Sequence, residues 1–113
     1  MPDTQPSQTD VVASLAAAKD AARQAYSIAL AINPDDENLS KLYDAWMAAE
    51  TIWSTAELHA LNADAVVAKA QADLDAATKE INNNLATLKD IAQWVKLLDG
   101  LVNLATAVGK FFV

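Results

Sequence analysis

The sequence predicts an all-α protein, and its composition gives the first reason. Of the 113 residues 53% are hydrophobic, yet there are only two glycines and three prolines. Strands and their turns need such residues at regular intervals, so this chain has few places to break. Alanine, which loses no side-chain entropy in a helix, is abundant throughout. We therefore expect long amphipathic helices packed as an antiparallel hairpin or bundle.

A seven-residue repeat of apolar positions supports this class further. Two series, three residues apart, start at Leu39 and Leu42, and of their 22 positions only Gly109 and Asn84 are not hydrophobic. The overall composition alone would fill about 12 of them. The second series also carries successive alanines that would line one edge of a helical seam: Ala49, Ala56, Ala63, Ala70 and Ala77. Small residues there let two helix backbones approach closely, which favours antiparallel packing over a parallel zipper.

The first helix is expected over residues 9–33, after a disordered lead-in at residues 1–8. Ser7 and Thr9 both suit the N-cap, because their hydroxyls can accept from the free N–H groups of the first turn. Pro34 disfavours helical geometry in the residue before it, so the helix should end there. Residues 9–113 form a single helical domain in this interpretation.

Two further helices are expected over residues 35–81 and 84–112. Asp35, Asp36 and Glu37 suit a helix start, since carboxylates stabilise the positive end of the helix dipole. The second helix should end at the asparagines of residues 82–84, which are poor in helix interiors and good as caps. A further break at residues 62–64 stays open, and with it the bundle has four helices instead of three.

The charge distribution excludes one class of partner. The net charge is −7, and residues 35–84 hold ten acidic and three basic side chains, which is also −7. A nucleic-acid backbone requires a basic surface, so we expect no nucleic-acid partner. The first ten residues are polar and lack the apolar core of a signal peptide, and no apolar run approaches the roughly 20 residues that span a bilayer. Cytoplasmic localisation is the default expectation, with leaderless secretion left open.

No group of side chains indicates catalysis, a metal site or a cofactor. There is no cysteine, and the only histidine, His59, has Glu57 two residues away, on a different face of a helix. Glu50, Glu57 and Asp64 recur every seven residues, but a solvated edge explains them better than a metal site, because bundle metal sites usually add a Glu-x-x-His pair. We expect a non-enzymatic protein.

Two sets of apolar side chains are candidates for partner binding. The first lies on one face of the second expected helix and comprises Tyr43, Trp46 and Trp53, with Tyr26 within reach across the hairpin. Core packing and an interaction surface both fit this set, because tryptophan and tyrosine concentrate at interface hot spots. The second set covers a wide arc of the C-terminal helix: Trp94, Leu98, Leu101, Val102, Phe111 and Phe112. One helical neighbour cannot cover so wide an arc, which favours a further partner.

These patterns give two functional hypotheses. The first is a non-enzymatic interaction or assembly protein that forms a homo-oligomer or docks a protein partner through its C-terminal helix. The alternative is a membrane-active protein that exposes residues 85–113 to a membrane surface. Residues 33–39 resemble the turn in the helical-hairpin subunits of bacterial secretion needles, which implies assembly. The apolar C-terminal segment resembles helices of α-helical pore-forming toxins, which implies the membrane alternative.

Overall fold

The computed structural model describes residues 7–62, 66–87 and 90–112, and it confirms the all-α class. Four helices form a bundle: α1 (Gln8–Ile32), α2 (Leu39–Leu58), α3 (Val67–Asn84) and α4 (Ile91–Gly109). In the described part of the chain the only extended pairing is a single antiparallel bridge between Leu61 and Phe112.

The second expected helix, residues 35–81, is wrong as one element. It begins only at Leu39, because residues 33–38 form a turn in which the Asn38 N–H donates to the Asp36 carboxylate at 2.7 Å. It is then divided, since α2 ends at Leu58 and α3 begins at Val67. The break that the sequence left open at 62–64 falls in this interval, of which residues 63–65 lie outside the described residues.

The ends of the other helices show which caps the sequence identified. Ser7 caps α1 and accepts from the Asp10 N–H, while the Asp10 carboxylate accepts from the Ser7 N–H, so the first of the two expected caps is correct. The C-terminal helix was expected from residue 84, but Asn84 ends α3 instead. Asp90 caps α4 by accepting from the Ala92 N–H at 3.0 Å, and it fixes the start seven residues later than expected. The expected lead-in at 1–8 falls largely on residues 1–6, which lie outside the described residues.

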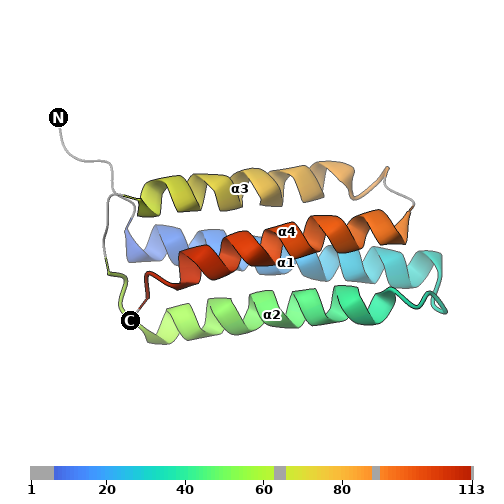
Figure 1. Ribbon diagram of the computed structural model, residues 1–113, viewed down its shortest axis with the longest axis horizontal. Coiled ribbons are helices and arrows are strands. Elements are labelled where there is room, and N and C mark those ends of the chain that lie inside the picture. The colour runs from blue at the N-terminus through green and yellow to red at the C-terminus, as the bar shows by residue number, and fades with distance from the viewer. Residues whose placement is uncertain (1–6, 63–65, 88–89, 113) are drawn as a thin grey trace.

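The helices form two antiparallel hairpins, α1 with α2 and α3 with α4 (Figure 1). The connection from α2 to α3 crosses one end of the bundle, so α1 lies parallel to α3 and α2 parallel to α4. α1 and α4 pack on each other across the middle, whereas α2 and α3 make no contact. The bundle is flattened as a result, and its Cα atoms span 50 × 26 × 16 Å.

Alanine explains the close approach of α1 and its neighbours. The buried face of α1 is built mainly from alanine, at Ala18, Ala21, Ala22, Ala25 and Ala29. The expected alanine seam continues this in α2, where Ala49 and Ala56 are buried. In α3, Ala70 and Ala77 are half-buried, and Ala63 lies outside the described residues. Larger side chains, chiefly leucine, fill the remaining core from α2, α3 and α4.

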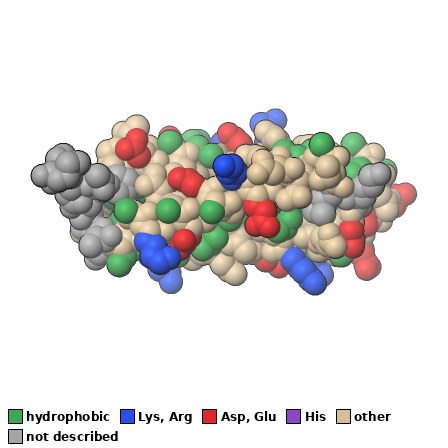
Figure 2. Space-filling view, turned by 90° about the horizontal axis from the view of Figure 1, so that it is seen from above, with side chains coloured by type: hydrophobic (Ala, Val, Ile, Leu, Met, Phe, Trp, Pro, Cys, Tyr) green, Lys and Arg blue, Asp and Glu red, His purple; other side chains and the backbone are tan. Residues whose placement is uncertain are grey.

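The outer side of α3 is mainly polar and charged, unlike the core. Figure 2 looks down on α3 and shows acidic and basic side chains interspersed, with hydrophobic groups scattered among them.

Within the described residues, no helix is long and apolar enough to cross a membrane.

Candidate docking surface on helices α1 and α2

The C-terminal helix does not present the apolar surface that its sequence indicated. Trp94, Leu98 and Leu101 are all 0% exposed. The sequence argument assumed one helical neighbour, but α4 packs on α1, α2 and α3 together, and these three cover its wide apolar arc. In this fold the three side chains are core residues. Val102 of the same set is half-buried, beside α2.

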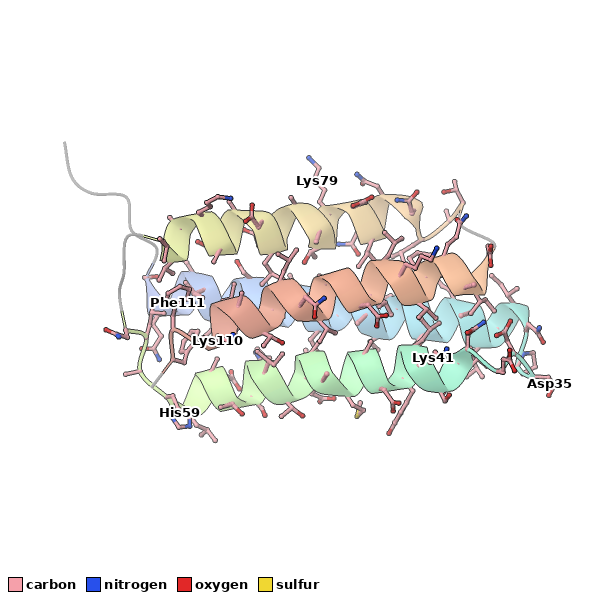
Figure 3. All side chains as sticks on the ribbon, in the orientation of Figure 1. Asp35, Lys41, His59, Lys79, Lys110 and Phe111 are labelled. Atoms are coloured by element: carbon pink, nitrogen blue, oxygen red, sulfur yellow. The ribbon has the colours of Figure 1, made fainter. Side chains whose placement is uncertain are left out.

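Phe111 and Phe112, the last members of that set, pack against the segment that links α2 to α3. Leu61 and Phe112 form the antiparallel bridge, and the Asn62 N–H donates to the Phe111 carbonyl at 2.6 Å. Both rings are half-buried. Figure 3 shows Phe111 at the same end of the bundle as His59. Residues 111 and 112, which follow α4, thus help to hold the crossing segment in place.

The three aromatic side chains near the α1–α2 turn form a cluster, as the sequence indicated. The ring of Tyr26 stacks on Trp46, with 5.9 Å between ring centroids, and meets Tyr43 edge-on at 5.6 Å. Tyr43 and Trp46 are nearly perpendicular, also at 5.6 Å. Offset and edge-to-face pairs of this kind contribute about 0.5–1.5 kcal/mol each beyond their buried area. Tyr43 is 43% exposed, so the cluster reaches the surface.

Trp53 has a partner that the sequence analysis missed. The Lys19 ammonium lies 4.1 Å from the centroid of the Trp53 ring, a cation–π contact. The seven-residue repeat could have predicted this contact between Lys19 and Trp53. In an antiparallel hairpin, a step of seven residues forward on one helix matches seven backward on the other. Once Tyr26 is placed against Trp46, the same step places Lys19 against Trp53.

We refer to Tyr26, Tyr43, Trp46 and Trp53, with Lys19, as the aromatic face. Tyr26, Trp46 and Trp53 are half-buried. Their position follows from the alanines beneath them, because backbones that approach through Ala22, Ala25 and Ala49 leave no room for rings between them. The rings are therefore displaced to the outer edge of the seam. Leu30, one turn beyond Tyr26 on α1, extends this surface and is 41% exposed.

The only histidine and the acidic segment at the α1–α2 turn lie apart in the bundle. His59 is exposed at the C-terminal end of α2, and Asp35 lies at the opposite end of the bundle (Figure 3). Asp36 accepts from the Asn38 N–H and the Asn33 side chain accepts from the Asp35 N–H, so this acidic segment builds the turn. Across residues 7–62, 66–87 and 90–112, no three acidic or histidine side chains converge where a metal could bind.

The fold defines a four-helix bundle with one diagonal connection, and the aromatic face is its most distinctive surface. Comparison of the chain with protein-family models, curated proteins and solved structures finds no match.

Proposed function

We propose that this chain is a non-enzymatic helical interaction protein that docks a protein through the aromatic face. One observation carries the proposal: Tyr26, Trp46 and Trp53 lie half-buried along one helical hairpin, packed against its alanine- and leucine-rich core, and Tyr43 beside them is exposed. Half-buried rings of this kind leave apolar area in water that a partner could cover.

The chemistry of these side chains fits a docking surface. Tryptophan and tyrosine dominate interface hot spots because a rigid ring buries a large area with few rotatable bonds to immobilise. The aromatic contacts hold Tyr26, Tyr43 and Trp46 against one another, and the cation–π contact holds Trp53. Rings that are already ordered lose less entropy when a partner binds.

The aromatic rings gather on one hairpin, whereas other exposed large hydrophobic side chains, at Ile32, Leu58 and Val66, lie singly at helix ends. The α3 side of the bundle carries interspersed charges of both signs, a pattern typical of a solvated surface (Figure 2). The membrane-active alternative would require α4 to leave the bundle and expose Trp94, Leu98 and Leu101, each now fully buried. The aromatic face requires no such rearrangement, which favours a protein partner.

Site-specific photo-crosslinking tests this proposal. A photoreactive amino acid replaces Tyr43 in one variant and Lys79 in a control, since Lys79 projects away from the bundle on α3 (Figure 3). In the native cell we expect one discrete protein adduct from position 43 and none from position 79. The adduct should disappear when Trp53→Ser is added. Equal crosslinking from both positions, or none from position 43, would contradict the proposal.

A further inference from the structure

Two opposite charges beside the aromatic face form no ion pair with the described part of the chain. Arg23 lies on α1 between Lys19 and Tyr26, and Glu50 lies on α2 between Trp46 and Trp53. Within the described residues, the ion pairs are Lys19 with Asp20 and Lys69 with Asp73, and neither Arg23 nor Glu50 takes part in one. Glu50 is half-buried and Arg23 is exposed. Each charge is therefore free to meet an opposite charge on a docked surface.

The two charges also lie at the same level along the bundle. Lys19 meets Trp53, and Tyr26 meets Trp46, across the antiparallel hairpin. Four residues forward from Lys19 is Arg23, and three residues back from Trp53 is Glu50, which are nearly equal steps along the two helix axes. One helix thus presents a positive charge, and the other a negative charge, at the middle of the aromatic face.

We propose that the occupant of the aromatic face is a second copy of this chain, an inference that rests on the proposed function. The two copies are related by a two-fold axis parallel to the helices. This axis places α1 of each copy against α2 of the other at the same level. Arg23 of each copy then faces Glu50 of the other, which forms the charge pair twice. An axis perpendicular to the helices would instead place α1 on α1, with Lys19 and Arg23 facing like charges, which is unfavourable.

The available area is sufficient for such a dimer. The face of the α1–α2 hairpin is roughly 30 Å long and 20 Å wide, from the length of α2 and the usual separation of packed helices, and the rings occupy about the middle 15 Å of it. Two such faces bury about 1,200 Å² in total, which lies at the lower end of specific interfaces. The rings form the centre of this interface and the charges set its orientation, as in known interfaces where electrostatics fixes register.

Charge reversal with complementation in trans tests the dimer. By analytical ultracentrifugation, we expect the wild-type chain to be a dimer at micromolar concentration. Arg23→Glu and Glu50→Lys should each weaken dimerisation by on the order of tenfold or more, because each creates two like-charge contacts. An equimolar mixture of the two variants should form a heterodimer, since both of its contacts then join opposite charges. The double variant should dimerise with itself.

Controls separate this test from effects on folding. Both single variants should keep the wild-type circular dichroism spectrum, and Lys79→Glu on α3 should dimerise as the wild type does. A monomeric wild-type chain would overturn the dimer, and single variants that stay dimeric would overturn the proposed two-fold geometry. Monomeric variants that do not complement each other when mixed would overturn the two-fold geometry. If the chain is a monomer but position 43 still crosslinks to a different protein, the dimer fails and the proposed function stands. If position 43 also forms no crosslink, both the dimer and the proposed function are contradicted.

Discussion

The two hairpins of this bundle use their aromatic side chains in opposite ways. In the α3–α4 hairpin, Trp94 is 0% exposed and lies in the core, while the outer side of α3 is charged. In the α1–α2 hairpin the core is largely alanine, and Trp46 and Trp53 lie half-buried at the edge. The indole N–H of Trp94 has no hydrogen-bond partner in the described residues, so the apolar area that the ring buries must offset the cost of this unpaired donor.

The difference shows that backbone spacing decides where a ring can go. α1 carries small residues toward the centre of the bundle, so large side chains from α4, including Trp94, can fill the space above them. The same alanines draw α2 close to α1, and rings on α2 cannot enter that seam. One set of small residues therefore accommodates one tryptophan and excludes the other two.

The largest expected effect on stability distinguishes the core tryptophan, Trp94, from the tryptophan of the aromatic face, Trp53. Trp94→Ala should lower the free energy of unfolding by roughly 3–5 kcal/mol, because it leaves a large cavity in the core. Trp53→Ala should cost about 1–2 kcal/mol, from partial burial and the lost cation–π contact. Urea denaturation measures both. Similar losses for the two variants would mean that both rings belong to one core, which would remove the contrast between the hairpins.

The alanine seam can be tested by overfilling it. Ala22→Leu should destabilise the bundle by roughly 1–3 kcal/mol, because Ala22 is fully buried where α1 meets its neighbours. Ala31→Leu, on the exposed side of the same helix, is the matched control and should change stability by less than about 0.5 kcal/mol. If Ala22→Leu is tolerated as well, α1 does not approach its neighbours as closely as its alanines indicate.

The sequence predicted the helices and their apolar faces because both follow from local rules. Periodicity identifies a buried stripe, and Pro34, Ser7 and the asparagines near 84 mark helix ends. Periodicity does not show how deeply a side chain is buried, because burial depends on how many helices pack against its own helix. α4 acquired three, so Trp94, Leu98 and Leu101 became core where one neighbour would have left them exposed. The path of the connection between α2 and α3 could not be predicted from the sequence either, because it depends on contacts between residues that are distant in sequence.

Gln8 makes two of these distant contacts, and they can be removed without touching the core. The Gln8 side chain donates to the His59 carbonyl at 3.0 Å and accepts from the Leu61 N–H at 3.3 Å, so it ties the start of α1 to the crossing segment. Gln8→Ala should destabilise by about 1 kcal/mol, since both hydrogen bonds are exposed. Hydrogen exchange at the Leu61 amide should accelerate. Gln24→Ala, an exposed glutamine on α1, is the control, and equal exchange in both variants would show that Gln8 does not secure the crossing.

The smallest effect concerns the two glycines of α4, which differ in what lies beside them. A Cβ added at Gly100 meets nothing within 4 Å, whereas one added at Gly109 would lie 3.0 Å from the Ile52 Cγ2 atom of α2. Gly100→Ala should therefore stabilise by roughly 0.5–1 kcal/mol, because alanine loses less backbone entropy in a helix. Gly109→Ala should instead destabilise by about 1 kcal/mol, since overpacking exceeds a propensity gain that is small at the last helical residue.

Adding Ile52→Ala to the Gly109→Ala variant distinguishes a clash from any other cause. The Ile52 substitution alone should cost stability, because it removes packing where α2 meets α4. If the methyl groups of Ile52 and Ala at position 109 collide, the double variant should lose less than the two single losses together, and the difference is the coupling between the sites. Urea midpoints of the four proteins give this value. Additive losses would mean that the end of α4 moves away from α2 without cost, and that only the α1 seam of this bundle is tightly packed.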